Sequence, residues 1–298
     1  MPNRPIMVTG GSGQLATALA VLSPDEIRVV GRPEFDFDQP DTIDECVRDL
    51  QPSVVINAAA WTAVDAAESD PAGARRANCD GPARLAAMCQ QAGIPLVHIS
   101  TDYVFDGSKG APYVETDPTS PTGVYGATKL DGERAVHEAC ARSVIVRTAW
   151  VYSATGKNFV RTMLNAAQTR DRLRVVADQR GCPTSAAGLA RVALGVARAA
   201  RDEWRDEFAG VFHSCGTGET TWHGFAEAIF EEAARYGARR PIVDAITTAE
   251  YPTPAKRPAD SRLDCSKLAH VFGLRQPAWR ESLVRVIDQL QPRAQAPA

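Results

Sequence analysis

The chain has 298 residues, of which 44% are hydrophobic and 23% charged, and its formal charge is −3. This slightly acidic balance leaves no basic surface for a nucleic-acid backbone or an anionic membrane, so neither is an expected partner. The seven cysteines show no CxxC pair and no zinc-ligand spacing, and the sequence shows no signal-peptide core and no membrane-spanning apolar stretch. We therefore expect a cytoplasmic protein with free thiols and no protein-bound metal.

Short apolar runs alternate with helical patterns through the first half of the chain. Ile6–Val8 precedes a glycine-rich turn and the helical pattern Gln14–Leu22. Four later runs are too short for helices and are bounded by turn or helical residues: Ile27–Val30, Val54–Ile56, Leu96–Ile99 and Val144–Val146. Such runs are typical of buried parallel strands with helices on both faces. The sequence therefore predicts an α/β fold with a Rossmann-like, doubly wound parallel sheet.

The pattern loosens after residue 150, where proline-containing stretches interrupt the helical segments Gly188–Ala200 and Trp222–Tyr236. We expect residues 1–150 to form the sheet domain, with a returning segment near 184–213. Residues 151–298 would then form mainly a smaller C-terminal substrate-binding lobe. The tail, residues 291–298, is expected to be frayed.

A glycine-rich loop lies between the first strand and the first helix, with the spacing Gly10-x-x-Gly13-x-x-Ala16. Glycines there let a pyrophosphate approach the helix N-terminus, where free N–H groups favour anions. A plain strand-to-helix turn is the alternative, but the strand before the loop and the helix after it favour dinucleotide binding. The residues 1–150 are therefore predicted to bind NAD(P).

Arg32 follows the second predicted strand, with acidic residues shortly after it. An acid at the strand end would select the free 2′-hydroxyl of NADH, whereas Arg32 would hold the 2′-phosphate of NADPH. This placement favours NADPH, with a solvated loop arginine as the alternative.

Tyr125 and Lys129 lie four residues apart in a helical pattern, so they share one helix face. A nearby positive charge lowers the pKa of a phenol, which would suit Tyr125 to acid–base catalysis. An exposed helix pair is the alternative. The strand that leads into Thr101 and Asp102 favours catalysis, because ligands bind at the carboxyl edge of such a sheet. His98, inside that strand, is expected to be a core histidine, and Cys182 a small buried side chain.

These motifs together resemble the short-chain dehydrogenase/reductase superfamily in its long form. Five further stretches resemble, more narrowly, the dTDP-4-dehydrorhamnose reductases, and the likeness covers nearly the whole chain. They begin at Asn57 (NAAAWTAVDAAE), Ser100 (STDYVFDG), Arg147 (RTAWVY), Asp178 (DQRGCPT) and Tyr251 (YPTPAKRP).

The resemblance implies a role for each matching residue. Tyr125 would protonate the ketone oxygen, Thr101 would hydrogen-bond the same oxygen, and Lys129 would hold the nicotinamide ribose. The remaining cofactor contacts would be Gly13, Gln14 and Leu15 at the pyrophosphate, Asp36 and Phe37 at the adenine, and Ala60, Trp61 and Thr62 after the third strand; the family usually has His or Tyr in place of Trp61. Asp102 and Trp150 would face the deoxythymidine sugar.

Arg257 stands in a proline-bounded loop, and from its charge we expect it near the substrate diphosphate; a surface arginine is the alternative. The activity that the resemblance implies is reduction of the 4-keto group of dTDP-4-dehydro-6-deoxy-L-mannose to dTDP-L-rhamnose by NADPH, with NADH tolerated. Two alternatives stay open: a nucleotide-sugar epimerase or dehydratase, and a non-catalytic NADP-binding regulatory subunit of methionine adenosyltransferase. A magnesium requirement and a homodimer are also left open.

Overall fold

The computed structural model describes residues 4–291, so the predicted frayed tail lies, from residue 292 on, outside the described part. Within this range six parallel strands form one sheet in the order β10-β5-β4-β3-β1-β2. Their bounds are β1 Ile6–Thr9, β2 Ile27–Val30, β3 Val54–Asn57, β4 Leu96–Thr101, β5 Ser143–Thr148 and β10 Gly210–His213. The predicted Rossmann-like parallel sheet is confirmed.

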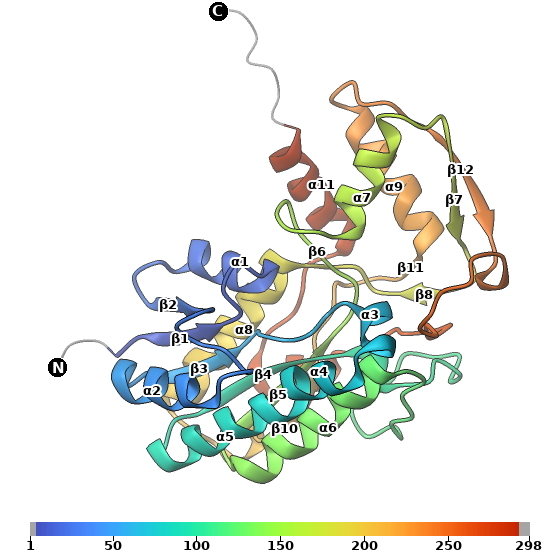
Figure 1. Cartoon of the computed structure of the whole chain (residues 1–298). Helices are drawn as coiled ribbons and strands as arrows, with labels where there is room; N and C mark the ends of the chain where they lie inside the picture. Colours follow the sequence, from blue (N-terminus) through green and yellow to red (C-terminus); the bar gives the residue numbers. More distant parts are fainter. Residues whose placement is uncertain (1–3, 292–298) are drawn as a thin grey trace, which may run out of the picture.

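Helices cover both faces of this sheet (Figure 1). Two of them pack together on one face: α1 Gln14–Leu22 and α8 Ala186–Asp202. The other face carries α2 Pro40–Leu50, α5 Gly81–Ala92 and α6 Val124–Ala139. Along β1, Ile6 and Val8 join the core with α1 and α8, whereas Met7 joins the opposite core with α2 and α5. Because helices cover both faces of the sheet, a strand such as β1 appears in the sequence as a continuous apolar run.

The direction in which strands are added reverses at β1, because β2 lies on one side of it and β3 on the other. The loops that leave β1 and β3 therefore diverge at the carboxyl edge of the sheet and open a crevice between them. After β3 the chain forms α3 Val64–Ser69, α4 Pro71–Arg75 and a π-helical turn, Arg76–Asp80, that continues into α5. The crevice is the place where a doubly wound fold binds its ligand.

A smaller lobe stands beyond this edge (Figure 1), with its own core around Tyr152, Phe225 and Trp279. It contains α7 Phe159–Ala167, α9 Trp222–Ala234, α11 Trp279–Leu290 and the parallel pair β7 Arg172–Val176 and β12 Ile242–Ile246. Short strand pairs connect it to the sheet: β6 Val151–Tyr152 with β9 Thr184–Ser185, and β8 Arg180–Gly181 with β11 Thr220–Thr221.

The chain returns from the lobe to the sheet through α8 and β10, and α10 Ser266–Phe272 packs against both. All seven cysteines are free thiols, and six of them are buried. In the described part of the chain, no helix combines the length and apolar character that a membrane span requires.

Candidate active site

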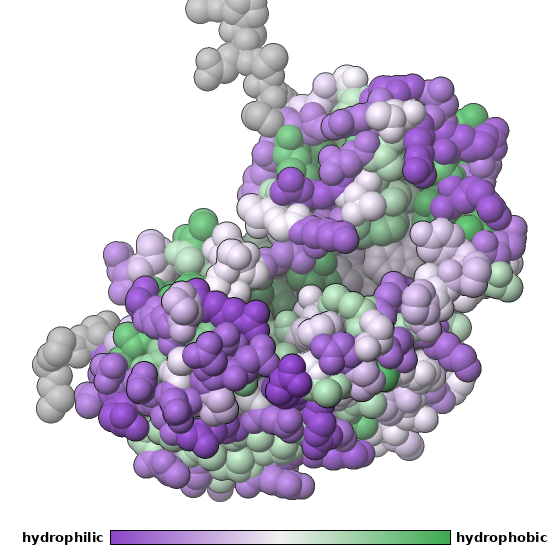
Figure 2. Space-filling view, in the orientation of Figure 1, coloured by the Kyte–Doolittle hydropathy of each residue, from purple (hydrophilic) through white to green (hydrophobic). Residues whose placement is uncertain are grey.

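A cleft of about 1080 Å³ follows the carboxyl edge of the sheet and reaches the base of the lobe. Figure 2 shows the hollow between the two parts of the molecule. Every predicted site residue except Arg257 lines this one cleft: Gly10, Gly13, Gln14, Leu15, Arg32, Asp36, Phe37, Ala60, Trp61, Thr62, Thr101, Asp102, Tyr125, Lys129 and Trp150. The fold thus brings together residues from six segments that the sequence only places in order.

The glycine loop forms a cradle whose shape requires glycine. Gly10 has φ +107°, and a Cβ there would lie 3.0 Å from the carbonyl oxygen of Ala58. A Cβ on Gly31 would lie 2.7 Å from the Cα of Gly11 in the same loop. Helix α1 begins immediately afterwards, and its N-cap Gly13 has no side chain to satisfy the first N–H groups. Open N–H groups at a bare helix start fit the pyrophosphate of a dinucleotide.

Gln14, the first residue of α1, joins this cradle to the lobe. Its Oε1 accepts hydrogen bonds from Ser153 Oγ at 2.7 Å and from Asn158 Nδ2 at 3.1 Å. Lys157, in the same short loop, lines the cleft. The sequence analysis missed this loop, because no motif marks a segment that lies about 140 residues after the glycine loop.

At the far end of the cleft, Arg32 forms ion pairs with Asp36 (Nε–Oδ1, 2.9 Å) and Asp38 (Nη2–Oδ2, 2.8 Å). Arg76, a second residue that the sequence analysis missed, pairs with the other oxygen of Asp38 at 2.9 Å. Both arginines line the cleft and both are more than half exposed. Phe37 lines the same end of the cleft, belongs to the core with Met7 and Val30 of the sheet, and lies against Gly81, where a Cβ would be 2.3 Å from its ring. This end therefore offers an apolar ring and two solvent-facing guanidinium groups.

The loop after β3 is held by Asn78, which is fully buried in the π-helical turn. Its Oδ1 accepts the N–H of Trp61 at 2.9 Å, and its Nδ2 donates to Thr128 Oγ1 of α6 at 3.2 Å. The Trp61 indole N–H donates to the carbonyl of Ala63. Asn78 thus fixes the backbone of the Ala60–Thr62 wall relative to the helix that carries Tyr125 and Lys129.

Tyr125 lies in the first turn of α6, next to Thr101 at the end of β4. Burial raises the pKa of Tyr125 to about 12, while a hydrogen bond with Thr101 acts in the opposite direction. The sequence analysis expected Lys129 to lower the pKa of this phenol; in the structure the dominant effect is burial, and it acts the other way. A phenol with this pKa holds its proton at neutral pH, which suits a proton donor.

Lys129 is 1% exposed, and burial lowers its pKa to about 8 although Glu133 acts to raise it. Its Nζ donates to the carbonyl of Ile99 at 2.7 Å and lies 3.5 Å from His98 Nε2. The predicted pair therefore lies on one helix face, as the spacing indicated, but it is buried rather than exposed.

The lobe side of the cleft is formed by Trp150 and Asp102. Trp150 has φ +47°, a strained value for a bulky residue, and its ring stacks on Trp222 with centroids 3.5 Å apart. Burial raises the pKa of Asp102 to about 6, and its Oδ1 accepts the Thr101 hydroxyl at 2.9 Å. An aromatic ring and a carboxyl group thus face the same space as Tyr125.

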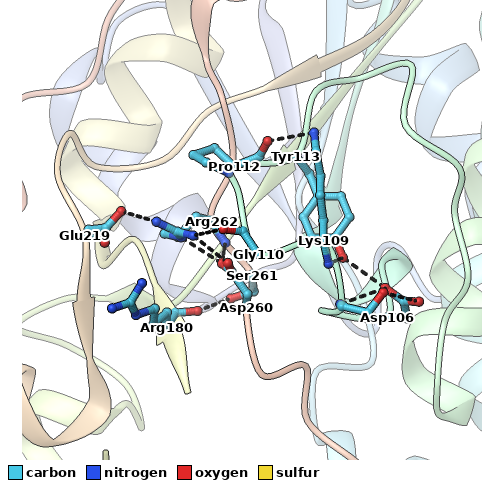
Figure 3. Close-up of polar contacts among 11 residues, drawn as sticks. Asp106, Lys109, Gly110, Pro112, Tyr113, Arg180, Glu219, Asp260, Ser261 and Arg262 are labelled. Atoms are coloured by element: carbon cyan, nitrogen blue, oxygen red, sulfur yellow. Dashed lines mark hydrogen bonds and ion pairs between the residues drawn. The ribbon is translucent and has the colours of Figure 1, made fainter. Parts of the chain in front are cut away.

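Arg257 does not line the cleft. Its guanidinium pairs with Asp65 of α3 through Nη2–Oδ2 at 2.8 Å and Nη1–Oδ1 at 3.1 Å, and Nη1 also donates to Thr253. Arg262 is a second anchor of the lobe: it donates to Asp260, Glu219 and the carbonyl of Gly110, as Figure 3 shows. Both arginines hold segments beside the cleft in place.

No three His, Cys, Asp or Glu side chains within residues 4–291 are grouped so that they could hold a metal ion.

Known proteins resemble this chain over almost its whole length. The family model described as RmlD substrate binding domain matches residues 4–292. A dTDP-4-dehydrorhamnose reductase of Sinorhizobium fredii is 47% identical over 284 residues, which are 95% of this chain and 96% of that protein. The chain belongs to the dTDP-4-dehydrorhamnose reductase family.

Solved structures of reductases with this name share the whole architecture. One from Clostridium acetobutylicum is 39% identical with a TM-score of 0.89, and the match covers 96% of this chain and 99% of that one. Another, from Bacillus anthracis, is in complex with NADP; it is 33% identical with a TM-score of 0.88 and the same coverage. The resemblance stated from the sequence is confirmed.

Proposed function

We propose that the chain reduces the 4-keto group of dTDP-4-dehydro-6-deoxy-L-mannose to the alcohol of dTDP-L-rhamnose, with NADPH as the reductant. The observation that carries the proposal is the convergence of Thr101, Tyr125 and Lys129 with a glycine-cradled helix start in one cleft. Curated relatives that bear the reductase name over almost the full length support it, as does the NADP complex of the relative from Bacillus anthracis. Such a reaction takes place where the nucleotide cofactor is kept, so the cytoplasm remains our predicted location.

In this reaction the bound nicotinamide supplies a hydride to C4 of the sugar, and the protein supplies the proton that completes the hydroxyl group. Tyr125 donates that proton to the keto oxygen, and it is fully protonated at neutral pH because burial holds its pKa near 12. Thr101 donates its hydroxyl proton to the same oxygen, for which it exchanges its hydrogen bond to Asp102 Oδ1. Lys129 directs N–H bonds to the ribose beside the nicotinamide. The protein therefore contributes orientation and one proton.

The sugar nucleotide is assigned to the lobe side of the cleft. The face of Trp150 offers a surface for a ring, and Asp102 offers an acceptor for sugar hydroxyl groups. Arg257 stays a proposed diphosphate contact; to reach a phosphate it would have to exchange its contact with Asp65, which is 42% exposed at the side chain. Exchange of an exposed carboxylate for a phosphate costs little, because surface ion pairs are weak.

NADPH is the proposed preferred cofactor, because Arg32 and Arg76 both reach the adenosine end of the cleft. A 2′-phosphate would replace Asp38 as their shared partner and form stronger charge-assisted hydrogen bonds. Without that phosphate Asp38 continues to pair both arginines, and neighbouring Asp36 is an acceptor for a free ribose hydroxyl group. NADH is therefore expected to bind less tightly but to remain a substrate.

The test follows absorbance of NADPH with enzymatically prepared dTDP-4-keto sugar and, in parallel, the UDP analogue. We expect one NADPH consumed per dTDP sugar reduced, and a much lower rate with UDP. An epimerase or dehydratase would regenerate its cofactor and show no net consumption, and a non-catalytic NADP-binding subunit would bind NADPH without turnover. Either of those results would overturn the proposal.

A further inference from the structure

A chain of buried polar side chains runs behind the cleft, from the sheet to Lys129. Thr9 of β1, Asn57 of β3 and His98 of β4 lie side by side on adjacent strands, and each is at most 1% exposed. Polar groups in the interior of a sheet are unfavourable unless they are hydrogen-bonded. A valine or isoleucine would fill each position without that cost, so this polar chain needs a reason beyond packing.

The orientation of the Asn57 amide follows from its neighbours. Its Oδ1 accepts hydrogen bonds from Thr9 Oγ1 at 2.6 Å and from the backbone N–H of Ala59 at 3.2 Å. The same N–H also donates to Thr9 Oγ1 at 3.1 Å. With the amide turned over, the Asn57 nitrogen would face this N–H at 3.2 Å, donor against donor, so the oxygen lies at this end of the amide. The Nδ2 group then faces His98 Nδ1 at 2.9 Å.

This contact fixes the tautomer of His98. An amide nitrogen only donates, so His98 Nδ1 must be the acceptor and the single ring proton lies on Nε2. Complete burial and the charge of Lys129 hold the pKa of His98 well below its usual range, so the ring does not gain a second proton near neutral pH. The Nε2–H group points at the Nζ atom of Lys129, 3.5 Å away.

A donor directed at an ammonium group cannot bond to it. The charged form of Lys129 therefore has one acceptor on the strand side, the carbonyl of Ile99 at 2.7 Å, and its remaining N–H bonds are turned toward the cleft. We propose that His98 is a positioning residue for Lys129, held by Thr9 and Asn57 as an Nε2–H tautomer that turns the Lys129 N–H bonds away from the sheet and into the cleft.

The neutral amine of Lys129 is a better partner for His98 than the ammonium group is, because the nitrogen lone pair of the amine can accept a hydrogen bond from Nε2–H. This agrees with the lowered pKa of Lys129, about 8, for which burial is the main cause. The other ionisable groups on this helix face are Tyr125 and Glu133; Glu133 acts to raise the pKa of Lys129 and is itself paired with Arg147. The proposal therefore adds to burial a second influence, that of His98, which favours the neutral amine where Glu133 favours the ammonium group.

The first test needs no substrate. In protein labelled with ¹⁵N-histidine, long-range spectra report which ring nitrogen of His98 carries the proton, and His98→Gln assigns the signal among the five histidines. We expect Nε2–H. A proton on Nδ1 would overturn the proposal whatever the variants do.

The second test titrates Lys129 directly by ¹³C NMR of labelled lysine, which is practical because the chain has five lysines, and Lys129→Met assigns the signal. Wild-type Lys129 should titrate near pH 8, against about 10.4 for an ordinary lysine. In His98→Gln the side-chain amide can turn its oxygen to the ammonium group, so the midpoint should rise by roughly one pH unit. Val97→Ala, on the same strand but in the core on the opposite face, is the matched control and should leave the midpoint unchanged. An unchanged midpoint in His98→Gln, or an equal rise in Val97→Ala, would contradict the proposal.

The catalytic consequence rests on the proposed function and is measured separately. If the charged form of Lys129 is the active one, the alkaline limb of the pH profile of kcat/KM for NADPH should move upward in His98→Gln by the same amount as the NMR midpoint. If His98 had a purely structural role, His98→Gln would lower the rate equally at every pH. That result would count against the proposal. Failure of the reductase activity itself would leave both NMR results standing, so the two failures are distinguishable.

Discussion

The buried ion pair between Arg147 of β5 and Glu133 of α6 allows a quantitative test of how the site is supported. The guanidinium and the carboxylate meet through two hydrogen bonds of 2.9 and 2.6 Å, and both side chains are only 4% exposed. Ser100 of β4 donates to the same carboxylate at 2.5 Å, so one group joins two strands to the helix that carries Tyr125. Arg147→Met keeps the volume but leaves Glu133 buried without its cation.

Removal of one partner of a buried pair typically costs about 3–5 kcal/mol, because the remaining charge stays desolvated. In a chain of this size that loss should lower the melting temperature on the order of 10 °C. Replacing both partners by apolar side chains, Arg147→Met with Glu133→Leu, removes the uncompensated charge and should recover most of the loss.

The assay is urea or thermal unfolding of the wild type, both single variants and the double variant, followed by circular dichroism. The cycle isolates the coupling between the two side chains, expected above about 2 kcal/mol. A single variant that loses less than about 1 kcal/mol, or a double variant no more stable than Arg147→Met, would refute the reasoning.

Four further predictions concern the cleft. Tyr125→Phe should lower the rate of NADPH oxidation at least about 100-fold while NADPH affinity by calorimetry stays within about twofold; near-wild-type turnover would exclude Tyr125 as the acid. Arg32→Ala should raise KM for NADPH roughly tenfold and leave KM for NADH nearly unchanged, and an equal effect on both would contradict the 2′-phosphate assignment. Gly10→Ala should lower the free energy of unfolding by about 1–3 kcal/mol and abolish cofactor binding, because φ is +107° and the new Cβ meets the backbone of the neighbouring loop. Unchanged NADPH binding would argue against the cradle. Burial raises the pKa of Asp102 to about 6, above its unfolded value, so the wild type loses stability as pH rises from about 4 through 6. Asp102→Asn should gain about 2 kcal/mol over the wild type at pH 7.5 relative to pH 4.5, and an equal difference at both pH values would contradict this.

Five of the six sheet strands could be predicted from the sequence, and four of them, β1, β3, β4 and β5, are buried on both faces. β1 and β3 are apolar at nearly every position, so a short apolar run indicates them directly. The lobe strand β7 alternates exposed Arg172 and Arg174 with buried residues, which weakens the apolar signal, and β10 begins at a glycine. Neither β7 nor β10 was therefore predicted from the sequence.

The sequence predicted site residues that belong to motifs and missed those that reach the cleft through tertiary structure alone. Tyr125, Lys129 and the glycine loop stand in recognisable patterns. Arg76 reaches the ribose end only because the π-helical turn packs beside α6, and Lys157 only because its loop crosses to Gln14. The partner of Arg257, Asp65, is 192 residues away, so charge alone could not show that this arginine is already paired.

The same limit applies to the electrostatics of Tyr125 and Lys129, the proposed catalytic pair. Spacing of four residues correctly placed Tyr125 and Lys129 on one helix face, and from that distance a cation should lower the pKa of a phenol. Burial is not visible in the spacing, and it acts on both groups toward their neutral forms: up for Tyr125 and down for Lys129. The two pKa values therefore lie in reversed order, near 12 and near 8, so near pH 8 the phenol still holds its proton while the ammonium is close to losing its own.

The proposed cofactor and substrate are both polyanions, whereas the chain has a net charge of −3. Its overall charge therefore does not attract them, and individual cations must lie beside their phosphates. Arg84, Arg198 and Arg239 are paired with carboxylates at the surface and do not line the cleft, so salt screens their charges from ligands bound there. Within the cleft, Lys157 is a lining residue, Arg32 and Arg76 share Asp38, and Lys129, with its pKa lowered to about 8 by burial, is still mostly charged at neutral pH. Arg32 and Arg76 thus gather two cations at the end of the cleft that we propose for the adenosine 2′-phosphate. At neutral pH a pKa of about 8 leaves Lys129 mostly charged and a pKa of about 6 leaves Asp102 mostly ionised, so one cation and one anion lie beside Tyr125, and their charges offset each other at the proposed reacting end.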